Sequence, residues 1–319
     1  MTTSIDFFSQ LQPSPLHFLT SEGSNQIYIK RDDLLPFSFG GNKARKAPYF
    51  FQNILQHGHT TVVTYGSKSS NHCRIIANLC AKHQLNCVII SPHSEDNQNF
   101  NRQLIQLSGA CIVECDVSEV PATIERIMRK LKNSNQQPYF IPGGGHGNLG
   151  TQAYVDAYQE ISDWQTQHKL IFDYIFLASG TGTTQAGLVT GTLLQQQTTK
   201  IIGISVARKS SHGTAVIKKS IQTYLNEFSL SSLIEHSLEP KIHFYDHYVP
   251  RQYGQFNPQI TEIIRDIYTQ HGIALSRTYT GKAYTGMLNY IRSQQLTHRH
   301  ILFLHTGGVP LFFNDLEDI

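Results

Sequence analysis

The segment SFGGNKARK, at residues 38–46, places a lysine directly behind two glycines and an asparagine. Imine formation with an aldehyde needs a neutral amine, and a lysine loses its proton readily when it is buried or lies near other cations. Arg45 and Lys46 follow Lys43 within one turn of the same predicted helix. Taken alone, however, the segment is more typical of a tight turn in which Asn42 caps the helix.

A second segment, SGTGTT at residues 179–184, lies between an apolar stretch and a helical pattern. Glycines there let backbone N–H groups approach an anion, the helix start adds positive potential, and threonine hydroxyls donate further hydrogen bonds. The pattern indicates phosphate binding, although the GK[ST] ending of a Walker loop is absent. A glycine-rich turn with Thr183 or Thr184 as the helix N-cap explains the segment equally well.

The segment SSNH, at residues 69–72, also leads from a predicted strand into a predicted helix. Ser70 or Asn71 as the helix N-cap is the simplest interpretation. The same geometry can hold a substrate carboxylate on free backbone N–H groups, while an asparagine amide donates to a ring oxygen. Of the sixteen histidines, His72 is the one to test, because it neighbours this loop. The histidines form no HExxH or comparable pattern, so we expect no metal site.

Short β-rich stretches alternate with longer helical patterns along almost the whole chain. Apolar strands separated by helices are typical of an α/β fold with parallel sheets covered on both faces. The strand–helix units are too many for one ordinary sheet, so we expect two, with GGGHGN at residues 143–148 as the hinge. Ligands bind outside the carboxyl ends of such strands, so the three segments above and HTGG at residues 305–308 can converge on one crevice.

Composition and charge narrow the class of protein. The formal net charge of +3 over 319 residues is too small to argue for nucleic acid binding. No apolar stretch is long enough to span a bilayer, and the N-terminus shows no secretory signal. The five cysteines form no CxxC pair and lie in apolar segments, as reduced core thiols do. We expect a soluble cytoplasmic protein that binds neither nucleic acid nor membrane.

Several motifs occur in a fixed order between residues 29 and 311: IKRDD, FGGNKARK, SSNH, IPGGG, SGTGTTQAGL, YTGKAYTGM and HTGG. Together they resemble the pyridoxal-phosphate enzymes of the D-cysteine desulfhydrase and 1-aminocyclopropane-1-carboxylate deaminase family. The resemblance implies a tryptophan-synthase β-like fold of two parallel αβα domains, with pyridoxal phosphate between them, and a homodimer. Residues 1–50 and 147–319 would form the large domain, and residues 51–146 a small domain inserted within it.

Matching the motifs position by position implies roles for individual residues. Lys43 matches the family's Schiff-base lysine, and Ser70 matches a serine over the substrate that acts as acid, base or nucleophile. Asn71 matches the asparagine beside the cofactor's phenolic oxygen. Tyr279 in YTGK and Tyr253 in QYGQF match tyrosines that reach the cofactor and substrate. The implied catalytic residues are Lys43, Ser70 and Tyr279, and the implied substrate-binding residues are Ser70, Asn71, His72 and Tyr253.

The resemblance also implies a phosphate site in the loop at residues 180–184, with Lys46 as a further contact. The implied cofactor-binding residues are Lys43, Lys46, Asn71, Gly180, Thr181, Gly182, Thr183, Thr184, Tyr279, Thr280 and Thr306.

Two of these positions separate the branches of the family. Members that open a cyclopropane ring typically have glutamate in the form YEGK and leucine in the form HLGG, whereas this chain has Thr280 and Thr306. A carboxylate facing the pyridine nitrogen keeps it protonated, whereas a hydroxyl leaves it neutral, which suits elimination of a good leaving group. We therefore predict α,β-elimination, with D-cysteine as the favoured substrate and pyruvate, ammonia and hydrogen sulfide as products. Freed Lys43 would remove the α-proton.

The sequence leaves other functions open. The loops YGSKS and GGGHGN depart from the family's usual forms, so the substrate is open and includes 1-aminocyclopropane-1-carboxylate. A more remote alternative is an NADP-dependent reductase that uses residues 179–184 for the pyrophosphate and Arg208 for the 2′-phosphate. Another is a non-catalytic protein that binds pyridoxal phosphate or amino acids.

Overall fold

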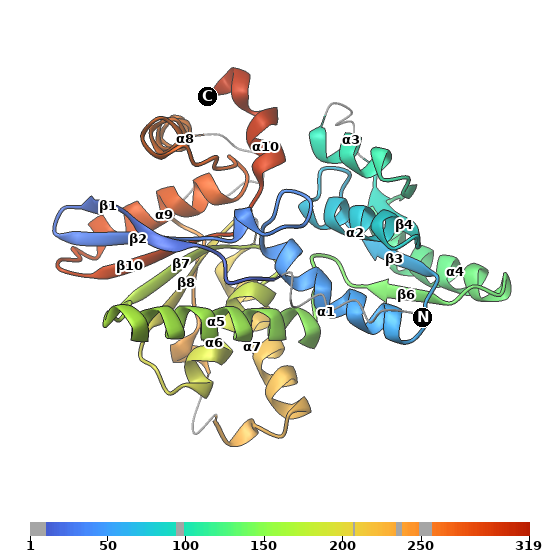
Figure 1. The fold of residues 1–319 in the computed structure, drawn as a ribbon, viewed down its shortest axis with the longest axis horizontal. Coiled ribbons are helices and arrows are strands. Elements are labelled where there is room, and N and C mark those ends of the chain that lie inside the picture. The colour runs from blue at the N-terminus through green and yellow to red at the C-terminus, as the bar shows by residue number, and fades with distance from the viewer. Residues whose placement is uncertain (1–10, 94–98, 207, 234–237, 249–256) are drawn as a thin grey trace.

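The computed structural model describes residues 11–93, 99–206, 208–233, 238–248 and 257–319. Two sheets lie side by side in Figure 1, each between layers of helices. The α/β architecture with parallel sheets predicted from the sequence is confirmed. None of the helices in the described ranges is long and apolar enough to cross a membrane.

The larger sheet has six strands in the order β1-β2-β10-β7-β8-β9. Its first two strands form an antiparallel hairpin, and all the other neighbouring pairs are parallel. The strands are β1 (Leu16–Glu22), β2 (Asn25–Arg31), β7 (Tyr174–Ser179), β8 (Lys200–Ser205), β9 (His243–Tyr245) and β10 (His300–His305).

The smaller sheet has four parallel strands in the order β5-β4-β3-β6. They are β3 (Thr61–Tyr65), β4 (Asn86–Pro92), β5 (Cys111–Cys115) and β6 (Pro138–Ile141). The predicted domain boundaries at 50/51 and 146/147 stay a prediction, and the helix α1 extends across the first of them.

Helices connect the strands and cover both faces of each sheet (Figure 1). They are α1 (Asn42–Gln56), α2 (Asn71–Lys82), α3 (Phe100–Leu107), α4 (Val120–Asn133), α5 (Asn148–His168), α6 (Thr183–Leu194), α7 (Ser210–Glu227), α8 (Pro258–His271), α9 (Thr280–Ser293) and α10 (Val309–Asn314).

Alternation along the strands explains why both faces are covered. In β10, Ile301 and Phe303 pack into a core with α8 and α9, whereas Leu302 and Leu304 pack into a core with α5, α6 and α7. Successive side chains of a strand point to opposite faces, so a strand that is apolar throughout needs helices on both sides. The same division holds in the smaller sheet, where α1, α2 and α3 cover one face and α4 covers the other.

The packing of α6 against α5 depends on glycine. A Cβ atom placed on Gly191 would lie 2.5 Å from Cβ of Tyr158, and one on Gly187 would lie 2.4 Å from Cβ of Tyr154. Such contacts are far shorter than van der Waals distances, so the two helices can approach this closely only because these positions lack a side chain. This contact fixes the position of α6 relative to α5.

We predict that Gly191→Ala destabilises the protein by about 1–3 kcal/mol, because the added methyl group overpacks the interface with Tyr158. The sign is diagnostic, since glycine to alanine in an exposed helix stabilises by up to about 1 kcal/mol. Chemical denaturation measures the change, with Thr166→Ala on the exposed side of α5 as the control. Unchanged or increased stability of Gly191→Ala would show that the helices are free to separate.

Candidate active site

The loops at the carboxyl ends of β3, β7 and β10 surround a cavity of about 470 Å³ between the two sheets. Most of the residues implied by the motifs line it. They are Lys43, Ser70, Asn71, His72, Gly180, Thr181, Gly182, Thr184, Tyr279 and Thr306. Three others, Lys46, Thr183 and Thr280, are buried close to these loops but do not line the cavity. Tyr253 lies outside the described residues.

The turn before Lys43 is clamped between the ends of two strands. The Gly41 N–H donates to the Asp32 carbonyl at 2.7 Å, and the Asn42 N–H donates to the Thr306 carbonyl at 2.9 Å. A Cβ atom on Gly41 would lie 2.7 Å from the Thr306 oxygen, and the φ angle of this residue is 97°. Glycine is therefore required here for both space and backbone conformation.

The structure corrects the expectation that Asn42 caps this helix. The N-cap residue of α1 is Gly41, and Asn42 is the first helical residue. The Asn42 Nδ2 atom instead donates to Oγ1 of Thr184 at 3.0 Å, which ties the start of α1 to the start of α6. Asn42 already lies inside the helix, and its amide makes this tertiary contact instead of a cap.

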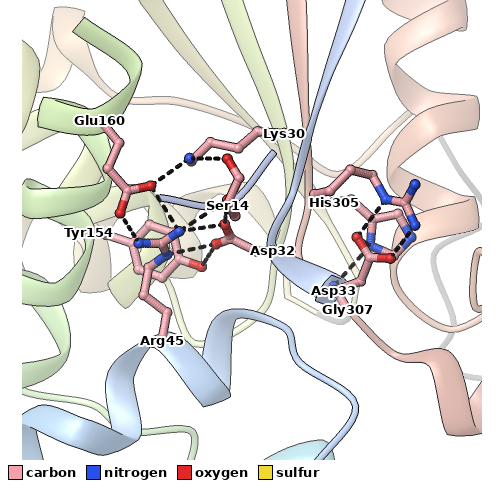
Figure 2. A network of polar contacts seen from close by, with 10 residues as sticks. Ser14, Lys30, Asp32, Asp33, Arg45, Tyr154, Glu160, His305 and Gly307 are labelled. Atoms are coloured by element: carbon pink, nitrogen blue, oxygen red, sulfur yellow. Dashed lines mark hydrogen bonds and ion pairs between the residues drawn. The ribbon is translucent and has the colours of Figure 1, made fainter. Parts of the chain in front are cut away.

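A buried polar network holds the other end of this turn in place. Figure 2 shows that Asp32 and Asp33 point to opposite sides of the chain, Asp32 toward Arg45 and Asp33 toward His305. Asp32 accepts hydrogen bonds from Nε and Nη2 of Arg45, at 3.0 and 2.7 Å, and from Tyr154 at 2.6 Å. Burial alone would raise the pKa of Asp32, but the Arg45 guanidinium and its hydrogen bonds hold it well below its usual range.

The sequence suggested that Arg45 lowers the pKa of Lys43, but Arg45 is not available for this role. Its guanidinium is paired with Asp32 and with Glu160, which also accepts from Lys30 at 2.6 Å. The Lys43 amine is partly exposed to the cavity and has no hydrogen-bond partner among the described residues. Burial lowers its pKa to about 8.

Lys46 is a second buried lysine, one helical turn after Lys43. Its side chain is fully buried, its Nζ atom has no hydrogen-bond partner among the described residues, and it lies 5.7 Å from the ring centroid of Tyr154. Burial, followed by the charge of Lys43, lowers the pKa of Lys46 well below its ordinary value. An uncompensated buried ammonium is costly unless an anion lies nearby.

The start of α2 combines a cap with a neutral histidine. Ser70 is the N-cap, and its hydroxyl oxygen accepts from the backbone N–H groups of His72 and Cys73. The Thr64 hydroxyl donates to the Ile141 carbonyl at 2.8 Å, so it must accept from Nε2 of His72, also at 2.8 Å. Burial, then the charges of Lys43 and Lys46, lower the pKa of His72 to about 3. His72 is thus neutral with its proton on Nε2.

The opposite end of the cavity is suited to an anion. The N-terminus of α6 points backbone N–H groups at it, and Gly182, with a φ of 86°, is the N-cap. The hydroxyl of Ser179 and Nη1 of Arg208 are buried without hydrogen-bond partners among the described residues. His146 lines the same end, and its Nδ1 atom lies 2.7 Å from Oγ1 of Thr183.

Several cavity residues with polar side chains are not among those implied by the motifs, including Tyr65, His146, Ser179 and Arg208. The sequence suggested Arg208 only as a contact for NADP. The available signal was position, because Tyr65 and Ser179 are the last residues of β3 and β7.

Thr280 lies differently from Thr306. Its hydroxyl accepts the Ser276 N–H at 2.9 Å inside the turn before α9, whereas Thr306 lines the cavity. A threonine oxygen engaged in this way still has its proton to donate.

Comparison with known proteins identifies the family of this chain. The sequence model of the family described as "Pyridoxal-phosphate dependent enzyme" matches residues 9–307. The chain belongs to the pyridoxal-phosphate-dependent enzymes. A D-cysteine desulfhydrase of Serratia proteamaculans is 32% identical over 296 residues, which cover 90% of this chain and 88% of the relative. A D-cysteine desulfhydrase of Salmonella paratyphi A is 31% identical over 312 residues, covering 94% and 93%.

A solved structure described as an ACC deaminase homologue is also similar to this pyridoxal-phosphate enzyme. Its TM-score is 0.85 at 31% identity, and the match covers 97% of this chain and 93% of the other. The predicted fold of the pyridoxal-phosphate enzymes and the predicted cofactor are confirmed.

The residues present fit this cofactor. A phosphate group needs donors, and the end of the cavity that is suited to an anion has backbone N–H groups together with the orphaned atoms of Ser179 and Arg208. An aldehyde needs an amine of lowered pKa, and Lys43 has one facing the cavity.

We predict that removal of the Asp32 charge weakens the whole site. Asp32→Asn leaves Arg45 buried with one carboxylate fewer and should cost about 3 kcal/mol of stability at neutral pH. Because the folded pKa of Asp32 is depressed, this stabilisation is present above the unfolded value of about 3.8 and is lost as the pH falls below it. Denaturation of the variant, of Arg45→Met and of the double variant measures the coupling, and additive losses would contradict the interaction.

We also predict that Lys43 of the cofactor-free protein is acylated with a pH midpoint near 8, because burial favours its neutral form. Competitive labelling with an amine-selective reagent, followed by mass spectrometry of the peptides, measures the midpoint. The exposed Lys132 on α4 monitors the reagent in the same digest. A midpoint near the ordinary lysine value of 10.5 would be inconsistent with a desolvated amine.

Proposed function

We propose that this enzyme is a D-cysteine desulfhydrase that carries out α,β-elimination and releases pyruvate, ammonia and hydrogen sulfide. The observation that carries the proposal is the buried Lys43 amine, with a pKa lowered to about 8, in the same cavity as an anion site. The relatives named D-cysteine desulfhydrase, at 31–32% identity over about nine-tenths of the chain, support the choice of substrate.

When bound, pyridoxal phosphate supplies an electron sink that stabilises negative charge at the α-carbon of an amino acid. Lys43 would hold its aldehyde carbon, and once the substrate's amino group has displaced it, the freed neutral Nζ of Lys43 would take the α-proton. An amine with a pKa of about 8 is close to the value at which proton transfer at neutral pH is efficient.

The start of α2 is proposed to bind the substrate carboxylate. Backbone N–H groups and the helix N-terminus favour an anion there, and the Ser70 hydroxyl keeps its proton for donation because its oxygen already accepts. His72 contributes no positive charge to this site, because its low pKa keeps it neutral and excludes it as a cationic acid. We assign Ser70 and Tyr279, which both line the cavity, as proton donors to the leaving group.

The remaining residues are assigned to the cofactor. We assign Asn71 to its phenolic oxygen, the loop at residues 180–184 and Lys46 to its phosphate, and Thr280 and Thr306 to the ring nitrogen. The orphaned Nζ atom of Lys46 supports the phosphate assignment, because a dianion nearby would compensate its charge. Tyr253 stays a prediction. The homodimer and the cytoplasmic location also stay predictions.

A second candidate is 1-aminocyclopropane-1-carboxylate deaminase, which the similarity to the solved ACC deaminase homologue suggests. We favour elimination because no carboxylate among the described residues lines the cavity, so a protonated ring nitrogen has no anionic partner there. The NADP-dependent reductase is set aside, since the chain belongs to the pyridoxal-phosphate enzymes.

The test is an assay of wild type and Lys43→Ala with D-cysteine, L-cysteine, β-chloro-D-alanine and 1-aminocyclopropane-1-carboxylate. We expect pyruvate and sulfide from D-cysteine, and a loss of at least about 10³-fold in Lys43→Ala, because the general base is removed. Lys132→Ala, on the exposed face of α4, is the matched lysine control. 2-Oxobutyrate from the cyclopropane substrate alone would select the deaminase, and tight cofactor binding without turnover would select a non-catalytic binder.

A further inference from the structure

Arg74, on the first turn of α2, is a fully buried arginine without a carboxylate partner among the described residues. Its Nε and Nη2 atoms have no hydrogen-bond partner there, and its guanidinium carbon lies 5.9 Å from the ring centroid of Phe39. Burial alone lowers the pKa of Arg74 to about 9, which leaves it charged at neutral pH. Burial of a charged arginine without a carboxylate partner is unfavourable, so the question is which interaction its charge supports.

The hydrogen bonds of Arg74 determine the orientation of two amide side chains. Its Nη1 atom lies 2.8 Å from Oδ1 of Asn71 and 2.7 Å from Oδ1 of Asn101. A guanidinium can only donate, so both atoms must be the oxygens of their carboxamides. The Asn101 Nδ2 atom donates to the Ser69 carbonyl at 2.8 Å and to Oδ1 of Asn71 at 3.0 Å, which agrees with this assignment.

The oxygen of Asn71 therefore receives two donors from inside the protein. Asn71 lines the cavity, and its Nδ2 atom has no partner among the described residues. The side chain is thus held as a donor toward the cavity, and rotation of the amide would set Nδ2 against the donors of Arg74 and Asn101. A donor whose oxygen already accepts from a cation is also more strongly polarised.

We propose that Arg74 is a positioning residue for the cofactor, which together with Asn101 locks Asn71 as a hydrogen-bond donor and stabilises negative charge on the ring oxygen. The inference rests on the proposed function, in which Asn71 lies beside the phenolic oxygen of pyridoxal phosphate. Arg74 acts through Asn71 and through its charge, since it does not itself line the cavity.

A purely structural arginine would act differently. Its replacement by an apolar side chain of similar volume would change the stability of the fold and leave the properties of a bound cofactor unchanged. A positioning arginine should instead affect the bound cofactor. Loss of a proton makes the bound cofactor more negative, and a nearby cation favours this deprotonated form. Without Arg74, the pH midpoint of the cofactor's visible absorption should therefore rise.

The experiment compares the holoenzyme with Arg74→Met, Arg74→Lys and Asn101→Asp. In Arg74→Met we expect the midpoint of the visible absorption band to rise by roughly one pH unit and the dissociation constant for pyridoxal phosphate to rise about tenfold. Arg74→Lys keeps the charge, so its midpoint should stay close to that of the wild type. Asn101→Asp, which has the same size, removes the donor to Asn71 and offsets the charge of Arg74, so it should also raise both values.

The control is Arg126→Met, which removes an exposed positive charge from α4 and should change neither value. Thermal unfolding monitors the fold, and Asn101→Asp decides the question if Arg74→Met does not fold. If the wild type binds the cofactor and the folded variants have the same midpoint and dissociation constant as the wild type, this inference is overturned but the proposed function is not. A wild-type protein that fails to bind pyridoxal phosphate would overturn the proposed function as well.

Discussion

The start of α1 is held by backbone hydrogen bonds to the ends of β2 and β10, and the other features of the site follow from this clamp. The Asp32 carbonyl and the Thr306 carbonyl each accept a backbone N–H from the turn that precedes Lys43. The Asp32 side chain also binds Arg45, which lies on α1. Asp32 therefore fixes α1 through both its backbone carbonyl and its carboxylate (Figure 2). A lysine on a helix held at two points has little freedom to leave the cavity.

The buried basic side chains differ in whether a carboxylate pairs with them. Lys30 and Arg45 are fully paired with Asp32 and Glu160, below the turn. Lys43, Lys46 and Arg74, at or beside the cavity, have no carboxylate partner among the described residues. Burial without a partner disfavours the charged form of such groups, and a nearby anion favours it. An anionic cofactor would therefore stabilise the charged forms of the side chains that lie near it.

Predictions from the sequence succeeded where local pattern sets the structure. Apolar strands predicted the parallel sheets, and strand-end loops predicted most of the cavity lining. The segment SSNH predicted a cap at Ser70 or Asn71, and the cap is Ser70. They failed where a distant partner decides. Asn42 looks like a cap in sequence but donates to Thr184, 142 residues away. Thr183 belongs to the phosphate-type loop, yet its hydroxyl faces His146.

The sequence by itself determined the family, the order of the loops and the kinds of groups that they bring, because these depend on residue type and on periodicity along the chain. Only the tertiary structure decided which of those groups are charged and where they point. Arg45 lost its role beside Lys43 to Asp32, and Asn71 received a fixed orientation from Arg74 and Asn101. Protonation and orientation depend on burial and on contacts across the fold, and neither is encoded in the spacing of residues.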